Sequence, residues 1–195
     1  MPKEQTQTAS LFSRSRNRRS YPAVIITQEM LDEANRLIPA TKVERTIASK
    51  IDTLTGHLGE FVVAQFLFGN WRQHRVGKNK GETDFSDIEV KTSAFPFSES
   101  LHLLVREDYA KKRKPKFYVQ VVLDVDSETA TTLSPHTKAL LCGYATAEEV
   151  DAAPLKDFGT KFGNNGGYRC HYIPITRLHH IQKLKKLYSN SEHRK

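Results

Sequence analysis

Apolar residues change their spacing near residue 70 of the chain. In the first part they recur every three or four residues, which predicts amphipathic helices over residues 27–39 and 41–52. A further helix over residues 55–68 is apolar on most of its faces, which predicts a place at the centre of the core. Beyond it, alternation with a period of two and short apolar runs predict β-strands.

The expected strands fill most of the second part of the chain. We expect them over residues 71–76, as a short pair within 82–93, and over 101–105, 117–123, 140–144 and 168–173. Short helices are expected over 146–152 and 176–188, and a polar loop over 159–167. Helices first, then a mixed sheet with helices interposed, predict a single domain of the α/β or α+β class.

Length and composition bound the class of protein. The 195 residues, 38% of them hydrophobic and 27% charged, allow one domain with a real core plus tails. We assign residues 1–22 to a flexible basic arm, 23–190 to the domain and 191–195 to a C-terminal tail. The longest apolar run, residues 61–68, is interrupted by Gln65 and is too short to span a bilayer. Residues 1–20 lack the apolar middle of a secretory signal, which predicts a cytoplasmic or nucleoid location.

Positive charge is in excess and clustered. Thirty Lys and Arg against 22 Asp and Glu give a formal charge of +8 and a pI near 9.5, which favours anionic partners such as nucleic acid. Basic runs also occur as solvated surface without a partner, so charge alone does not decide function. The three clusters are Arg14, Arg16, Arg18 and Arg19; then Lys111, Lys112, Arg113, Lys114 and Lys116; then Lys183, Lys185, Lys186, Arg194 and Lys195.

Two acids and a lysine stand in the arrangement Asp84-x4-Glu89-x-Lys91. If the two residues between Phe85 and Ile88 form a hairpin turn, Asp84 lies opposite Glu89, and alternation puts Lys91 on the same face as Glu89. Directly opposite residues have Cβ atoms roughly 5 Å apart, and two like charges so placed are destabilising without a cation between them.

A divalent metal ion would supply that cation. Carboxylate oxygens suit Mg²⁺ or Mn²⁺, which bind through few protein groups plus a substrate phosphate. Beside the metal, Lys91 would position a nucleophilic water or stabilise charge that builds on a phosphodiester. Glu60 is a further candidate, because positions i+4 and i+7 from it are Ala64 and Leu67, and an ionised group on an apolar stripe is costly without a partner.

Each of these features also has a simpler interpretation. An Asp, Glu and Lys with a free gap occur by chance about once in a chain of this length. Glu89 and Lys91 could decorate the solvent face of an edge strand, and Glu60 could be a first-turn acid favoured by the helix dipole. Their order favours the joint interpretation: a glycine-flanked helix with an acid, a turn-linked acid, then an apolar-acid-apolar-Lys strand.

In this order the chain resembles the PD-(D/E)XK nuclease superfamily, and the resemblance covers roughly residues 55–125. It implies a metal-dependent phosphodiester hydrolase with a restriction-endonuclease-like fold, in which a mixed central sheet is flanked by helices. The matching residues are Gly56, Gly59 and Glu60 with the apolar helix after them, then Asp84, then the run Ile88-Glu89-Val90-Lys91-Thr92-Ser93.

The resemblance also implies roles for the site residues. Asp84 and Glu89 hold the metal, the Val90 carbonyl and Glu60 join them, and Lys91 acts on the water. Two departures stand out: Thr83 replaces the proline that names the motif, and the interval between the two acids is short. The short interval leaves two other residues open as the first acid, namely Asp87 and Glu82.

We therefore expect a Mg²⁺-dependent or Mn²⁺-dependent deoxyribonuclease, and specifically an endonuclease. The arm from Arg14 to Arg19 and the block from Lys111 to Lys116 are expected to grip DNA phosphates. A homodimer is compatible with this chemistry, because two sites would then cut two strands. The alternative is a non-catalytic nucleic-acid-binding protein with a disused nuclease site, and it predicts binding without turnover.

Overall fold

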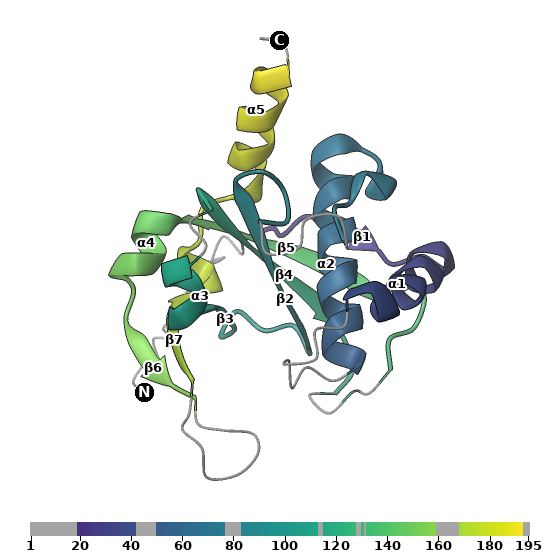
Figure 1. Ribbon diagram of the computed structural model, residues 1–195, viewed down its shortest axis with the longest axis horizontal. Helices are drawn as coiled ribbons and strands as arrows, with labels where there is room; N and C mark the ends of the chain where they lie inside the picture. The colour runs from purple at the N-terminus through teal and green to yellow at the C-terminus, as the bar shows by residue number, and fades with distance from the viewer. Residues whose placement is uncertain are drawn as a thin grey trace, which may run out of the picture.

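The described residues of the computed structural model form two β-sheets with helices packed around them (Figure 1). They are residues 19–41, 50–76, 83–112, 115–127, 130, 132–158 and 168–192. The strands are β1 (Ala23–Ile25), β2 (Ile88–Phe95), β3 (His102–Arg106), β4 (Phe117–Asp124), β5 (Lys138–Thr146), β6 (Leu155–Asp157) and β7 (Arg169–Pro174). The helices are α1 (Gln28–Thr41), α2 (Lys50–Phe68), α3 (Glu107–Lys112), α4 (Ala147–Ala152) and α5 (Ile181–Glu192), with short 3₁₀ helices η1 (Trp71–Gln73) and η2 (Ile175–Arg177).

The larger sheet is mixed, as the sequence predicts. Its strand order is β1-β5-β4-β2, in which β2 and β4 are parallel and the other pairs antiparallel. The smaller sheet, in the order β3-β7-β6, is antiparallel and was not expected as a separate sheet. The α+β class is therefore confirmed, with two sheets in place of one central sheet.

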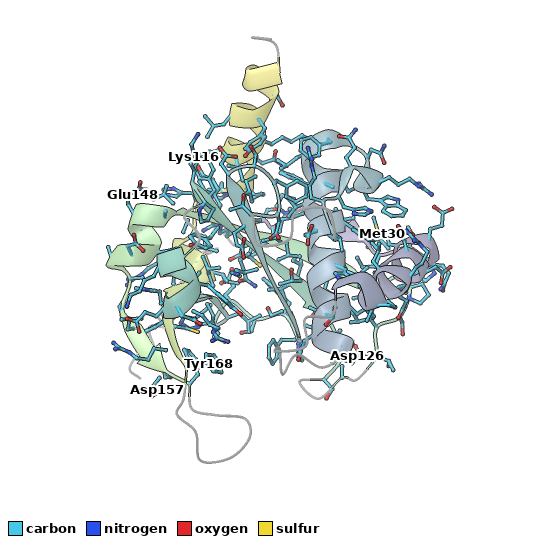
Figure 2. All side chains as sticks on the ribbon, viewed as in Figure 1. Met30, Lys116, Asp126, Glu148, Asp157 and Tyr168 are labelled. Carbon is cyan, nitrogen blue, oxygen red and sulfur yellow. The ribbon has the colours of Figure 1, made fainter. Side chains whose placement is uncertain are left out.

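Strand β4 separates two hydrophobic cores, because its alternate side chains enter opposite sides of the larger sheet. Val119 and Val121 pack in the core that contains α1 and α2. Tyr118 and Val122 pack in the core that contains β3 and α4. Both faces are covered, which explains why residues 117–123 are apolar except for the buried Gln120. Figure 2 shows side chains filling the space on both sides, with Met30 of α1 labelled in the first core.

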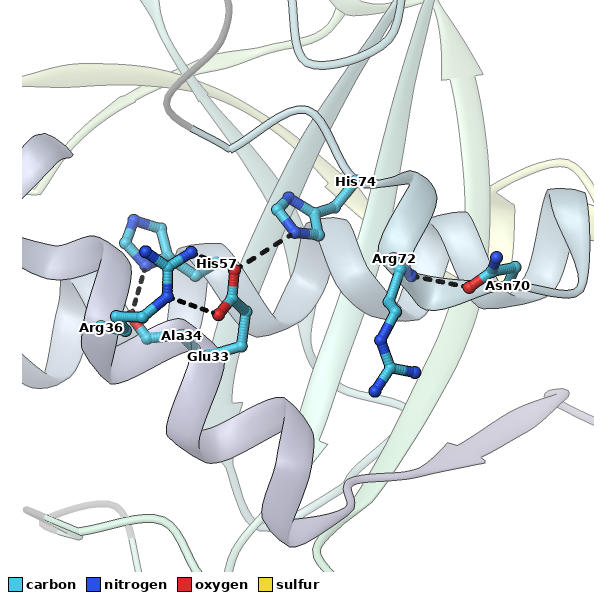
Figure 3. Close-up of polar contacts among 7 residues, drawn as sticks. All are labelled: Glu33, Ala34, Arg36, His57, Asn70, Arg72 and His74. Atoms are coloured by element: carbon cyan, nitrogen blue, oxygen red, sulfur yellow. Dashed lines mark hydrogen bonds and ion pairs between the residues drawn. The ribbon is translucent and has the colours of Figure 1, made fainter.

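Helix α2 is longer than expected, and polar contacts join α1 to α2 and to the segment that follows α2 (Figure 3). His57 Nδ1 donates to the Ala34 carbonyl of α1 at 3.0 Å, and His74 Nε2 lies 4.0 Å from Glu33 Oε1. The strand expected over 71–76 is wrong: Trp71 begins η1, and its ring and that of His74 pack on Phe61 of α2. Packing of these rings on the helix overrides the strand preference of the segment.

Within the described residues, no helix is long and apolar enough to cross a membrane.

Candidate active site

A two-residue turn brings Asp84 to the edge of β2. Phe85 and Ile88 exchange two backbone hydrogen bonds, of 3.0 Å and 2.6 Å, and Ser86 between them has a φ of 46°. The turn predicted from the sequence is therefore confirmed. It places Asp84 where its Oδ2 accepts a 2.7 Å hydrogen bond from the Val90 N–H. Because β2 ends the strand order, this contact lies at the outer edge of the sheet.

Glu89 and Lys91 form an ion pair on one face of β2. Lys91 Nζ lies 2.8 Å from Glu89 Oε1, which confirms that the two side chains share a face. The Glu89 side chain is only 6% exposed and that of Lys91 23% exposed. An acid so buried is not surface decoration, so the solvent-face interpretation is wrong for Glu89. Burial and the nearby Glu89 carboxylate together raise the pKa of Tyr118 on β4 to about 12.

Glu60 comes from α2, on the other face of β2. The preceding residue, Gly59, lies against Thr92, and a Cβ atom at position 59 would collide with Thr92 Oγ1. Helix and strand therefore approach closely enough to bring Glu60 to the turn. Glu60 lies well inside α2, which begins at Lys50, so the first-turn interpretation is wrong. Its Oε2 atom is buried and has no hydrogen-bond partner among the described residues.

The carboxyl group of Glu60 is held in its neutral form. Burial raises its pKa to about 9, and the negative charges of Asp84 and Glu89 add to the rise. The two other acids are thus within electrostatic reach of Glu60. Against them stands one paired cation, Lys91. A bound dication would lower the cost of ionising Glu60 next to Asp84 and Glu89.

The donors fit a hard cation by type, although they do not surround one in this conformation. Among the described residues, no three His, Cys, Asp or Glu side chains are grouped closely enough to hold a metal ion. The physical reason is the strand itself: Thr92 faces α2, so Glu89 and Lys91 project from the opposite face. Asp84 lies at the edge of the sheet, between its two faces, and its Oδ2 accepts a hydrogen bond from the Val90 N–H. The Val90 carbonyl points toward the same edge, because the N–H and C=O of one strand residue lie on the same side of the strand.

Asp87, the alternative first acid, is turned away from Glu60. Tyr188 of α5 donates its hydroxyl hydrogen to Asp87 Oδ1, and Lys116 Nζ lies 3.3 Å from Asp87 Oδ2. The Asp87 carbonyl also accepts backbone N–H bonds from residues 116 and 117. This geometry favours Asp84 as the first acid. Glu82, the other alternative, lies outside the described residues.

Tyr188 is a residue that the sequence analysis missed. Its hydroxyl fixes the turn that carries Asp84, and the hydrogen bond with burial raises the pKa of Tyr188. The only sequence signal was a tyrosine on the apolar side of the last expected helix. Nothing in the pattern connects that helix to the turn, because the two contacting residues lie 101 positions apart.

Arg19 has a place inside the domain. Its guanidinium donates hydrogen bonds to the carbonyls of Thr176 and Leu178, at 3.0 Å and 2.6 Å, and lies 5.6 Å from the Tyr21 ring centroid. Pro22 accepts a backbone hydrogen bond from Leu141 of β5. The end of the segment assigned to a flexible arm, residues 19–22, therefore contacts the domain. Arg14, Arg16 and Arg18 lie outside the described residues.

The second basic block is only partly described. Lys111 pairs with Glu107 on exposed α3 at 2.8 Å, and Lys116, labelled in Figure 2, pairs with Asp87. Lys112 is described only as part of the α3 backbone, and Arg113 and Lys114 lie outside the described residues. Phosphate binding by this block stays a prediction.

No protein-family model, curated protein or solved structure matches the chain. The chemistry of these side chains is therefore the basis for the function proposed below.

Proposed function

We propose that this chain is a Mg²⁺-dependent or Mn²⁺-dependent deoxyribonuclease of the PD-(D/E)XK type. One observation carries the proposal: the buried Oε2 of Glu60 has no hydrogen-bond partner among the described residues, and the charges of Asp84 and of the Lys91-paired Glu89 act on the Glu60 carboxyl group. A structural core rarely gathers several acids, because each unpaired buried charge is costly. A hydrolytic site needs several acids close together, because they bind the dication that in turn binds the phosphodiester.

Asp84 and Glu89 would hold the metal, with Glu60 and the Val90 carbonyl as further oxygen donors. When bound, the ion would neutralise phosphate charge and make a coordinated water more acidic. The chain's own contribution is positional. Asp84 is fixed by the Val90 N–H, and Glu89 is fixed by Lys91.

Lys91 is the group best suited to act on the phosphate. It is a partly exposed ammonium next to a nearly buried carboxylate, and its Nζ also lies 5.9 Å from the Tyr109 ring centroid. An ammonium group has three donor hydrogens, so Lys91 can keep Glu89 and still donate to a phosphate oxygen or a water. Charge that develops on the phosphate would be stabilised by this donor.

The order of elements also supports a restriction-endonuclease-like arrangement. A core helix is followed by a tight turn, a strand with the acid-x-Lys pair, and a parallel neighbour in a mixed sheet. The motif and the topology are independent lines of support. The motif depends on residue types and their spacing, whereas the topology depends on strand pairing.

The test is cleavage of plasmid, linear duplex and single-stranded DNA with Mg²⁺, Mn²⁺ or EDTA. Cleavage should require the metal and fall by about 100-fold or more in Lys91→Ala and in Asp84→Ala. Lys185→Ala is the matched control, because its ammonium also lies near an aromatic ring, 5.0 Å from the centroid of Phe66, and among the described residues it forms no ion pair with Glu60, Asp84 or Glu89. If Lys91→Ala cuts as well as the parent, the proposal is wrong.

A second candidate function is favoured by the closed geometry of the site. Lys91 is already paired with Glu89, and no set of three acids is grouped among the described residues. In a non-catalytic nucleic-acid-binding protein, Lys91 would stay paired with Glu89 and the acids would never gather around a metal ion. It predicts that all three DNA substrates are bound and none is cut with either metal.

A further inference from the structure

Cationic groups and aromatic rings alternate along a continuous row that begins at Lys91. Tyr109 of α3 is first, followed by Arg106, whose guanidinium carbon lies 4.7 Å from the Tyr109 centroid and 5.5 Å from that of Tyr168. The Tyr168 and Phe158 rings are stacked, with centroids 6.3 Å apart and an interplanar angle of 17°. The members of this row, which we call the cation-aromatic row, are Lys91, Tyr109, Arg106, Tyr168, Phe158 and Lys156.

Strand pairing in the smaller sheet explains why these residues are adjacent. Arg106 of β3 and Lys156 of β6 both pair with Cys170 of the central strand β7, so all three share one face of the sheet. Phe158 and Tyr168 follow and precede the paired strands and are joined by a backbone hydrogen bond of 3.2 Å. Tyr168 lies beside the end of β6 in Figure 2.

The far end of the row is open to solvent and apolar. Phe158 is 38% exposed and Tyr168 37% exposed, although each carries a large ring. Leu104, two residues from Arg106 on the same strand face, is 37% exposed as well. Together with the cations beside them, these exposed rings on one sheet face form the surface from which binding is inferred.

The charges along the row favour an anionic partner with flat apolar groups. Lys156 extends over the Phe158 ring, with 5.5 Å between Nζ and the centroid. Arg106 is held in a two-bond contact with Asp108, at 3.0 Å and 2.8 Å, which offsets its charge and orients its plane. Phosphates interleaved with bases match this alternation of cations and rings.

We propose that the cation-aromatic row binds an unpaired DNA strand and leads it to Lys91. Bases stack on Phe158 and Tyr168, phosphates lie near Lys156 and Arg106, and the strand continues past Tyr109 to the proposed hydrolytic site. The inference rests on the proposed function for the purpose of the row, but binding itself does not depend on cleavage. A duplex presents only base edges, so stacking on these rings requires an unpaired strand.

Binding is measured by fluorescence anisotropy in EDTA, which prevents turnover. The probes are a labelled single-stranded oligonucleotide of mixed sequence, the same sequence as a duplex, and the same strand with abasic positions. Phe158→Leu and Tyr168→Leu should each weaken single-strand binding by about 5-fold or more, with little change for the duplex. The abasic strand should bind the parent and these variants alike, because it has no bases to stack.

Lysine variants test the phosphate contact. Lys156→Gln should lower the slope of log affinity against log salt by about 0.7 for the single strand. The control is Lys185→Gln, which removes an ammonium placed over Phe66 in the same way but outside the row. Circular dichroism and thermal unfolding of each variant separate loss of folding from loss of binding.

The outcomes distinguish this inference from the proposed function. If the ring variants bind all three probes like the parent, the row is not a nucleic-acid surface, whether or not DNA is cut. If they lose single-strand binding but the parent cuts no DNA with either metal, the row is retained and the nuclease is not. Equal weakening for duplex, intact and abasic strands would overturn stacking, and binding of an acidic peptide in preference to DNA would overturn the choice of partner.

Discussion

Gly59 of α2 and Thr92 of β2 are in direct contact, with no space for a side chain at position 59. This contact sets the distance between the helix that carries Glu60 and the strand that carries Glu89 and Lys91. Gly56, one turn earlier on the same helix, has nothing within 4 Å of the place its Cβ would take. Two glycines of one helix thus differ in function: the first is free to change and the second is required by packing.

Alanine substitutions should separate the two glycines. Gly56→Ala should raise the free energy of unfolding by about 0.5–1 kcal/mol, because alanine loses less backbone entropy in a helix. Gly59→Ala should lower it by about 1–3 kcal/mol, because the methyl group forces α2 off β2. Urea unfolding measures both. Adding Thr92→Ala to Gly59→Ala should recover only part of the loss, since Thr92 Cβ would still lie 2.8 Å from the new methyl group; full additivity would contradict the contact.

The raised pKa of Glu60 predicts a pH-dependent stability for the metal-free protein. A folded-state pKa of about 9, against an ordinary value of 4.5, means that the folded chain binds the proton more tightly than the unfolded chain. Stability from this group is therefore complete below about pH 4.5 and is lost as the pH rises through about 9. Between about pH 5 and pH 9 the free energy of unfolding should fall by at least about 1 kcal/mol in EDTA.

Glu60→Gln is the control for this slope. In this variant the free energy of unfolding should depend less on pH than in the parent. The variant should also be more stable than the parent at high pH, because a neutral amide replaces the buried charge. Mg²⁺ should stabilise the parent at high pH and leave Glu60→Gln less affected, measured by thermal unfolding. A parent protein whose stability is constant over this range would show that Glu60 is ionised or exposed in solution.

The hydroxyl of Tyr188 is predicted to position Asp84 through the turn. Tyr188→Phe removes the donor to Asp87 Oδ1, so the unfolding free energy should fall by about 1–3 kcal/mol and cleavage should fall with a larger change in kcat than in KM. Ser189→Ala is the matched control, because it removes a hydroxyl whose bond within the described part of the chain is to its own helix, at the Lys185 carbonyl. Equal behaviour of the two variants would leave Tyr188 without a positioning role.

Arg19 is predicted to stabilise the domain and to contribute little to DNA affinity. Arg19→Gln removes the hydrogen bonds to the Thr176 and Leu178 carbonyls and should lower the unfolding free energy by about 1–3 kcal/mol. Arg36→Gln removes an ion pair with Glu33 at an exposed guanidinium and should lower the unfolding free energy much less than Arg19→Gln does. The salt dependence of DNA binding should stay unchanged in Arg19→Gln; a lower slope would return Arg19 to the phosphate contacts expected from its cluster.

Local features of the fold could be predicted from the sequence. The turn between Phe85 and Ile88, the buried strand β4 and the helix that begins after Thr146 all depend on neighbouring residues. Thr146 forms a capping box with Glu149, a signal that four consecutive residues contain in full. The pairing of Lys91 with Glu89 could also be predicted from neighbouring residues, because strand alternation puts the two side chains on one face.

Features that depend on distant segments could not be predicted. β1 and β6 have three residues each and exist only because β5 and β7 pair with them. The division into two sheets is equally hidden, because β3 has the same alternation whichever neighbour it joins. The pattern also cannot show that Glu60 lies on one face of β2 whereas Glu89 projects from the other, which is why these acids are not grouped as a metal site among the described residues.

The parallel pairing of β2 with β4 requires a crossover, and that crossover contains β3 and α3. Arg106 and Tyr109 therefore belong to the connection itself, whereas the acids and Lys91 precede it. Substitutions within this connection can therefore change the start of the cation-aromatic row while the spacing of Asp84, Glu89 and Lys91 stays the same. On the proposed function, such changes would alter which nucleic-acid strand is accepted and leave the hydrolytic step untouched.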